Sequence, residues 1–167
     1  MPHNDGVIGF RPLVEGDLDM MARWLAEPHV AAWWHAAEKQ VASMRAHIDD
    51  PTVSPFVVLL DDVPFGYIQL CDLDGERDNE PALAGQPAGT FGIDQFIGPA
   101  DKIGKGLGTR LVSAMAERAL ASDAKRVLVD PHPDNAAAIR AYEKAGFIRL
   151  GIFSMTSGPA LLMARDP

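Results

Sequence analysis

Thr90-Phe-Gly-Ile-Asp-Gln-Phe-Ile97, followed after a short connection by Ile103-Gly-Lys-Gly-Leu-Gly-Thr-Arg-Leu-Val112, is the stretch that decides the fold. The first segment predicts a strand, and the second predicts a glycine-rich turn that opens into an amphipathic helix over residues 106–121. The free N–H groups at a helix N-terminus, together with the helix dipole, make an anion site. Glycines let the backbone come close to a phosphate. The stretch therefore indicates a phosphate-binding turn.

Two common phosphate-binding motifs fit this turn poorly. A P-loop ends in Gly-Lys-Ser/Thr, whereas here Gly108 directly precedes Thr109. The dinucleotide-binding fingerprint has glycine where this chain has Thr109, and it follows the first strand rather than lying past mid-chain. A turn that needs glycine for purely local reasons remains an alternative.

Further elements can be placed on either side of this stretch. Strands are expected over 7–13, 56–60, 63–70, 126–129, 147–153 and 161–164, and helices over 17–25, 38–48 and 135–145. Asp17 is expected to cap the first helix, Asp61-Asp62 to form a hairpin turn, and Gly146 to end the last helix. Residues 72–89 are acidic and then rich in Gly, Pro and Ala, which is typical of one long loop. The order of elements predicts a mixed α/β fold.

Composition indicates a single domain over residues 1–167. Hydrophobic residues make up 47% of the chain and charged residues 23%, as in an ordinary globular protein. No apolar run approaches a membrane span, and the first six residues lack the pattern of a signal peptide. The single cysteine, Cys71, forms no internal disulfide, and the five histidines have no metal-ligand spacing. We therefore expect a cytoplasmic protein without a metal.

The charge balance points to cationic partners. Fifteen basic residues against 23 acidic ones give a net charge of −8, which repels nucleic acid and anionic membranes. Five of the acids fall within residues 72–80. They form either a solvated loop or a rim that steers a polycationic substrate inward; the sequence leaves both interpretations open.

The chain closely resembles the GNAT superfamily of acyl-CoA-dependent N-acetyltransferases in two motifs. Their pyrophosphate loop, Arg/Gln-x-x-Gly-x-Gly/Ala, matches residues 103–108, with Ile103 as the departure where the family has Arg or Gln. Asn135-x-x-Ala138-x-x-x-Tyr142-x-x-x-Gly146-Phe147 matches their C-terminal helix and the strand after it. The resemblance implies a splayed central sheet flanked by helices, with acetyl-CoA as cosubstrate.

Within that superfamily the chain most resembles aminoglycoside 6′-N-acetyltransferases. The shared runs begin at Pro28, Pro64, Gly92, Gly104, Asp130 and Tyr142. The resemblance implies acetyl transfer to a primary amine of a small cationic substrate by a monomer or a homodimer. It also implies cofactor contacts from Phe96, Ile97, Ile103, Gly104, Lys105, Gly106, Leu107, Gly108, Thr109, Asn135 and Ala138.

Two carboxylates are candidates for handling the amine. Strand alternation puts Gly92, Asp94 and Phe96 on one face, and a carboxylate in mid-strand is costly to bury without a purpose. The resemblance makes Asp94 the base or ammonium anchor; the alternative is a carboxylate satisfied by backbone N–H groups. Asp130 follows a strand end, where open sheets face ligand crevices, and it either binds a second ammonium or caps a loop.

The remaining candidates are aromatic or polar. By resemblance Tyr142 protonates the leaving thiolate, or it is a core tyrosine. Asn135 is a helix N-cap, a pantetheine contact, or both. Trp33 and Trp34 present flat faces to a sugar ring, or they fill the core.

The expected reaction is direct transfer, with an oxyanion stabilised by a backbone N–H within residues 93–96. Two other interpretations stay open. One is an acetyltransferase for siderophore hydroxylysine, another small amine or a protein. The other is a catalytically silent acyl-CoA-binding domain.

Overall fold

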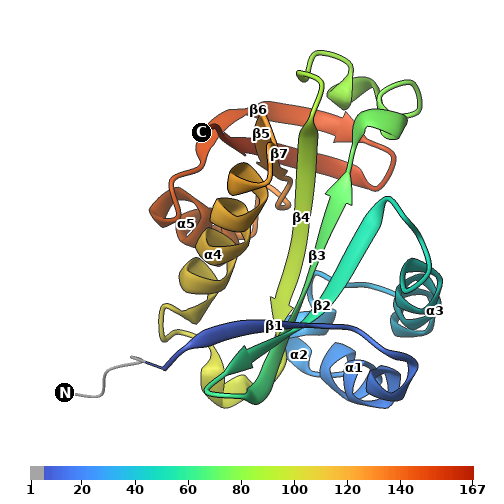
Figure 1. Ribbon diagram of the computed structural model, residues 1–167, viewed down its shortest axis with the longest axis vertical. Helices are drawn as coiled ribbons and strands as arrows, with labels where there is room; N and C mark the ends of the chain where they lie inside the picture. Colours follow the sequence, from blue (N-terminus) through green and yellow to red (C-terminus); the bar gives the residue numbers. More distant parts are fainter. Residues whose placement is uncertain (1–5) are drawn as a thin grey trace. The chain divides into compact units, whose positions relative to one another are not determined.

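The computed structural model describes residues 6–167 and contains a mixed sheet of seven strands (Figure 1). The strands are β1 (Ile8–Pro12), β2 (Val53–Leu60), β3 (Val63–Asp72), β4 (Thr90–Ile97), β5 (Arg126–Val129), β6 (Ile148–Met155) and β7 (Gly158–Arg165). Their order in the sheet is β1-β2-β3-β4-β5-β7-β6, and this mixed sheet with its helices confirms the expected α/β class. Met1–Asp5, within the stretch where no signal peptide is expected, lies outside the described residues.

Five α-helices and four 3₁₀ turns are seen among the described residues. The α-helices are α1 (Leu18–Leu25), α2 (Pro28–Ala31), α3 (Ala37–His47), α4 (Leu107–Ala121) and α5 (Ala136–Lys144). The 3₁₀ turns are η1 (Glu15–Asp17), η2 (Asp74–Glu76), η3 (Pro81–Leu83) and η4 (Ala100–Lys102). Within residues 6–167, none of the helices has the length and apolar character needed to span a bilayer.

The chain divides into two compact units, one of residues 1–69 with 95–111 and one of residues 70–94 with 112–167. The strands β3 and β4 and the helix α4 each contribute residues to both units. We describe each unit by itself. That the whole chain acts as one domain stays a prediction.

The first unit contains the antiparallel pair β1–β2, in register from Ile8↔Leu60 to Pro12↔Phe56. The turn that follows β2 is built on Asp61 and Asp62, which both have positive φ (48° and 66°). This is the backbone of a two-residue type I′ hairpin, which Asp tolerates better than most residues. The predicted hairpin turn is confirmed.

The core of the first unit is partly aromatic. The ring of Phe96 lies 5.1 Å from Trp34 and 5.5 Å from Tyr67, and Trp24 approaches it edge-on at 6.3 Å. Buried Met21, Leu25 and Val30 from α1 and α2 complete this cluster. Such ring pairs add stability beyond the area that they bury.

The predicted cap of α1 is wrong in its chemistry. Asp17 stands at the N-cap position, but its side chain makes no capping hydrogen bond to the helix. Its carboxylate instead accepts two hydrogen bonds from the guanidinium of Arg11 (2.8 and 2.9 Å) and one from the N–H of Val14 (2.9 Å). The Arg11 hydrogen bond is the main reason why the pKa of Asp17 is lowered. A hydrogen bond from a charged guanidinium is stronger than one from a helix N–H, so the carboxylate binds Arg11 and does not cap the helix.

The second unit holds the parallel pair β4–β5 and the antiparallel pairs β5–β7 and β6–β7. Figure 1 shows β6 and β7 running side by side as the two red strands of this unit. The register of β4 with β5 runs from Thr90↔Arg126 to Gly92↔Leu128, and β4 then continues to Ile97. The pairing thus covers only the first part of β4.

The end of α5 confirms the prediction for Gly146. This glycine has φ +91°. The N–H of Phe147 donates to the carbonyl of Tyr142 (3.0 Å), and the N–H of Gly146 donates to that of Glu143 (3.1 Å). This is the Schellman arrangement, and the rings of Tyr142 and Phe147, 6.0 Å apart, supply its usual hydrophobic contact.

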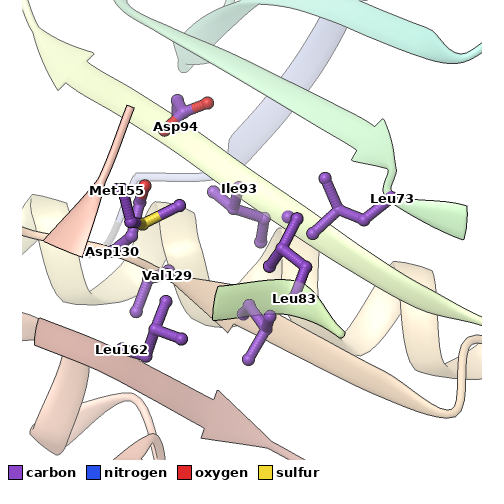
Figure 2. A pocket seen from close by; sticks show the side chains of 10 residues that line it. Leu73, Leu83, Ile93, Asp94, Val129, Asp130, Met155 and Leu162 are labelled. Atoms are coloured by element: carbon purple, nitrogen blue, oxygen red, sulfur yellow. The ribbon is translucent and has the colours of Figure 1, made fainter. Parts of the chain in front are cut away.

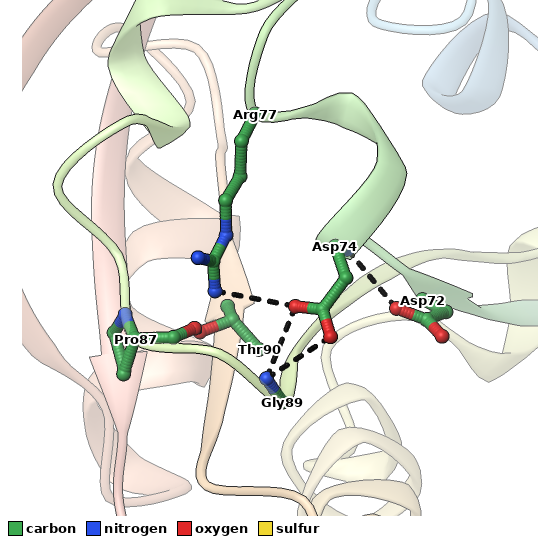
Figure 3. Close-up of polar contacts among 6 residues, drawn as sticks. All are labelled: Asp72, Asp74, Arg77, Pro87, Gly89 and Thr90. Carbon is green, nitrogen blue, oxygen red and sulfur yellow. Dashed lines mark hydrogen bonds and ion pairs between the residues drawn. The ribbon is translucent and has the colours of Figure 1, made fainter.

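The expected long loop over 72–89 is more ordered than predicted, because η2 and η3 interrupt it. Figure 3 shows how acidic side chains hold it. The carboxylate of Asp74 accepts from the N–H of Gly89 (3.0 Å) and pairs with Arg77 (3.2 Å), and Asp72 accepts from the N–H of Asp74 (3.0 Å). The hydroxyl of Thr90 donates to the carbonyl of Pro87 (2.6 Å). Two of the five clustered acids therefore organise the loop itself.

Candidate active site

Asp94 and Asp130 come together in the second unit. The last paired residues of β4 and β5 are Gly92 and Leu128. Parallel strands run in the same direction, so the residues just beyond this pair stay neighbours. They lie past the last backbone pairing of the two strands. The two carboxyl groups that the sequence singled out separately lie at this point and share one recess.

The recess has a volume of about 80 Å³, several times the ≈10–15 Å³ that one water molecule needs. Figure 2 shows the carboxyl groups of Asp94 and Asp130 to one side of the lining, and Leu73 and Leu83 to the other. The residues that line it are Leu73, Leu83, Gly92, Ile93, Asp94, Leu128, Val129, Asp130, Met155 and Leu162. Its size suits one amino group and the carbons next to it.

The surroundings of Asp130 disfavour its charged form. Burial raises the pKa of Asp130 well above its usual range, and the negative charge of Asp94 raises it further. A hydrogen bond between the two side chains acts in the same direction. Two neighbouring carboxylates resist double ionisation, and the raised pKa of Asp130 favours a proton on its carboxyl group next to Asp94.

Glu80 is a third carboxylate of this region, which the sequence placed only among the five acids of residues 72–80. Its charge contributes to the raised pKa of Asp130. Its carboxylate accepts hydrogen bonds from the hydroxyl (2.9 Å) and the N–H (3.2 Å) of Thr156, in the turn between β6 and β7. Within an acidic stretch, nothing in the sequence distinguishes Glu80 from its neighbours. Only the fold brings it to this turn.

The glycine-rich loop belongs to the first unit, directly before α4. Gly104 and Gly106 have φ values of +72° and +76°, which favour glycine. A Cβ at either position would meet no other atom within 4 Å, so this backbone is open to a ligand. Ile103 and Lys105 are exposed, whereas Leu107 is buried and anchors the start of the helix.

This loop fits the pyrophosphate of acetyl-CoA. Gly108 and Thr109 lie in the first turn of α4, where the N–H groups have no acceptor within the helix. Lys105 adds a positive charge next to these groups. The missing Arg or Gln at Ile103 removes one side-chain contact, but the backbone donors of the loop do not depend on it.

The aromatic candidates have separate surroundings. Trp34 packs in the core of the first unit, against Tyr67 and Phe96, whereas Trp33 is 42% exposed. The ring of Phe96 is buried in the same cluster, so only its backbone is available to a ligand. The carbonyl of Ile97 is hydrogen-bonded to the ring of His29 (2.9 Å).

Burial along β4 does not follow the expected alternation. Thr90, Ile93 and Phe96 are its buried residues, and none of the strand is fully exposed. A strand covered on both faces loses the two-residue pattern of a strand that faces water on one side. Asp94 and Phe96 therefore have different environments, although simple alternation would give them the same one.

The last candidates lie on or before α5, in the second unit. The side chain of Asn135 accepts a hydrogen bond from the N–H of Ala138 (3.3 Å), which confirms that it caps the helix. Tyr142 is 6% exposed and packs on Phe147. Among the described residues, no group of three or more His, Cys, Asp or Glu side chains has the geometry of a metal site.

Comparison with known proteins gives a consistent family. Residues 14–155 match the Acetyltransferase (GNAT) domain model. The chain is 35% identical over 170 residues to aminoglycoside N(6′)-acetyltransferase type 1 of Klebsiella pneumoniae, covering 97% of this chain and 84% of that protein. It is 27% identical to the lysine N-acyltransferase MbtK of Mycolicibacterium paratuberculosis, covering 99% of this chain and 76% of that protein.

A solved structure of the aminoglycoside acetyltransferase AAC(6′)-Ib in complex with paromomycin and acetyl-CoA has the same fold. The TM-score is 0.82 at 32% sequence identity, with 95% of this chain and 93% of the other covered. The chain therefore belongs to the GNAT acetyltransferase family, as an acetyl-CoA-dependent N-acetyltransferase of the aminoglycoside 6′-N-acetyltransferase-like type.

Proposed function

We propose that this enzyme acetylates the 6′-amino group of aminoglycosides. The observation that carries the proposal is the meeting of Asp94 and Asp130 in one recess. An ionised carboxylate is the natural partner of an ammonium group, and burial strengthens their attraction. The full-length similarity to an aminoglycoside N(6′)-acetyltransferase supports the same substrate.

Asp94 is the residue that handles the amine. Its carboxylate accepts hydrogen bonds from the ammonium group, orients it, and takes the proton that the nitrogen must lose before it attacks a carbonyl. Neutral Asp130 donates to Asp94 and holds that carboxylate in position. A backbone N–H within residues 93–96 stabilises the oxyanion that develops during attack.

The loop 103–109 holds the cosubstrate, with contacts from Phe96, Ile97, Asn135 and Ala138. When bound, acetyl-CoA supplies a thioester carbonyl that an amine can attack. The N–H groups of the loop bind its phosphates, and those of Gly106 and Gly108 are central. The hydroxyl of Tyr142 donates the proton that the leaving sulfur requires.

Trp33 is the better candidate of the tryptophan pair for a sugar contact. Its exposure leaves ring surface available to a ligand, whereas Trp34 is engaged in the core. We further propose that residues 1–167 act as one catalytic domain, as a monomer or a homodimer. Because the cosubstrate acetyl-CoA is found inside the cell, we propose that the enzyme acts in the cytoplasm.

A lysine-type amine is the second candidate substrate. The similarity to a lysine N-acyltransferase extends over 99% of this chain, and an aliphatic lysine arm would suit the apolar part of the recess. A catalytically silent acyl-CoA-binding domain is a third interpretation. The retention of both Asp94 and Tyr142 argues against it.

A thiol-release assay with acetyl-CoA separates these proposals. The panel should contain aminoglycosides, polyamines, lysine, hydroxylysine and peptides, and NMR should locate the acetyl group on each product. We expect the highest kcat/KM with aminoglycosides and acetylation at the 6′-nitrogen. Preference for lysine or hydroxylysine would favour the second candidate. Binding of acetyl-CoA without thiol release from any amine would favour the silent domain.

A further inference from the structure

The wall of the recess has a composition that the amine chemistry alone does not require. Of the ten lining residues, only Asp94 and Asp130 carry polar side chains. The other eight are Gly92 and seven residues with apolar side chains, among them Leu73, Leu83 and Met155. A substrate that places its ammonium on the carboxylate pair therefore brings the neighbouring carbon atoms against hydrocarbon.

This apolar wall is built into the fold. Leu83 and Leu128 belong to a buried cluster with Ala164, and Leu73 packs against that cluster. Side chains held in a packed core do not rearrange easily to provide a hydrogen-bond partner. We therefore expect the wall to keep its present shape and its apolar surface when a substrate binds.

Hydroxyl groups fit such a wall poorly. A hydroxyl that leaves water for an apolar surface loses hydrogen bonds that nothing replaces, whereas a methylene in its place gains from burial. A hydrocarbon pocket discriminates against an added hydroxyl only moderately, by a factor of up to about 100. The expected preference is thus clear but not absolute.

Resting on the proposed function, we propose that the enzyme prefers amines whose neighbouring ring carbons lack hydroxyl groups. The apolar side chains of Leu73, Leu83 and Met155 are the specificity determinant. Figure 2 shows Met155 next to Asp130, and the two leucines on the opposite side of the recess. The preferred substrate class is the deoxygenated aminoglycosides, in which the ring edge close to the 6′-amine is hydrocarbon.

Three compounds test this preference, because they share the 6′-amine and differ only in nearby hydroxyls. Kanamycin B has hydroxyls at both 3′ and 4′, tobramycin lacks the 3′ hydroxyl, and dibekacin lacks both. We expect kcat/KM to rise in that order, by roughly tenfold or more from kanamycin B to dibekacin. Equal values or the reverse order would overturn the inference and leave the proposed function standing. Absence of turnover with all three would overturn both.

A near-isosteric variant tests the location of the determinant. Met155 is half-buried near the end of β6, so Met155→Gln places an amide in the wall with little change in volume. We expect the preference for dibekacin over kanamycin B to fall at least about threefold, since the amide can bond a hydroxyl. Met20→Gln is the matched control, because Met20 is also half-buried but packs on the core of the first unit. An unchanged preference in Met155→Gln, or an equal loss in Met20→Gln, would overturn the assignment.

Discussion

The two regions that we assign to ligand binding are built in different ways. The loop around Gly104 and Gly106 is continuous in sequence, exposed, and presents backbone N–H groups. The pair of Asp94 and Asp130 is assembled from β4 and the residue that follows β5, is half-buried, and acts through side chains. Binding by backbone N–H groups is lost when the backbone conformation changes, but it survives most changes of side chain. Binding by a pair of side chains can be lost when a single side-chain atom is changed. Substitutions can therefore separate the two.

The largest effect is expected for Asp94→Asn. The change removes the ionised acceptor for the amine proton, so kcat/KM for the amine should fall by about 10²–10⁴. The apparent KM for acetyl-CoA should change little. Steady-state kinetics with thiol detection measures both values. Asp19→Asn, an exposed aspartate on α1, is the control. Wild-type turnover in Asp94→Asn would return this residue to a structural role.

Gly106→Val should act on the other region. A β-branched residue is strained at φ +76°, so the loop is expected to leave its present conformation. We expect a rise of about tenfold or more in the KM for acetyl-CoA, in line with the loss of one or two charge-assisted hydrogen bonds. Gly16→Val is matched, since Gly16 also has open space but a φ outside the left-handed region.

Lys105→Ala sharpens this comparison. If the backbone does most of the binding, removal of the exposed lysine should raise the KM for acetyl-CoA by less than about threefold, as for other exposed charge interactions. A larger effect than that of Gly106→Val would show that the side chain, and not the backbone, is the main phosphate ligand.

Tyr142→Phe should lower kcat by roughly tenfold if the hydroxyl protonates the thiolate. The ring and its contact with Phe147 are kept, so the melting temperature should change little. Tyr67→Phe provides the opposite case. Its buried hydroxyl donates to Gln69 (2.6 Å), and its loss should affect stability rather than kcat. Full activity in Tyr142→Phe would show that Tyr142, like Tyr67, is a core residue and does not protonate the thiolate.

A further prediction concerns the pH dependence of stability at Asp130. Its pKa is raised in the folded protein, so the folded state holds a proton that the unfolded state releases near pH 4. This contribution to stability is fully present below about pH 4 and is lost as the pH rises toward the folded pKa, by at most about 1.4 kcal/mol per pH unit. Asn does not ionise, so Asp130→Asn should not lose this stability as the pH rises.

The free energy of unfolding of Asp130→Asn relative to wild type should therefore increase between pH 4 and pH 7. Denaturant titrations of both proteins at several pH values measure the difference. A difference that is constant with pH would mean that the wild-type carboxyl ionises normally.

Local signals in the sequence were sufficient for much of the fold. The strand, glycine turn and helix of residues 90–121, the turn at Asp61 and Asp62, and the cap at Asn135 each depend on neighbouring residues. The Schellman end at Gly146 is of the same kind. Such features are readable because their partners lie within one turn of the chain.

Features that depend on distant residues were not predictable in the same way. The sequence singled out Asp94 and Asp130 as separate candidates. It did not indicate that they line one recess, or that Asp94 helps to raise the pKa of Asp130. Nothing in the sequence distinguished Glu80, which binds Thr156, from the other acids of the loop. Nor did the sequence indicate that the Asp17 side chain would bind Arg11 and leave the helix uncapped. Each of these depends on which segments the fold brings together.

The central claim is that the Asp94 and Asp130 pair binds the amine. Its most direct test is the dissociation constant of an aminoglycoside, measured by calorimetry on CoA-saturated enzyme for wild type, Asp94→Asn and Asp130→Asn. We predict that Asp94→Asn weakens amine binding by about tenfold or more, the effect of removing a charged partner. Asp130→Asn, which keeps a donor to Asp94, should weaken it less, and the dissociation constant of CoA should stay unchanged in both. Wild-type affinity for the amine in Asp94→Asn would contradict the account.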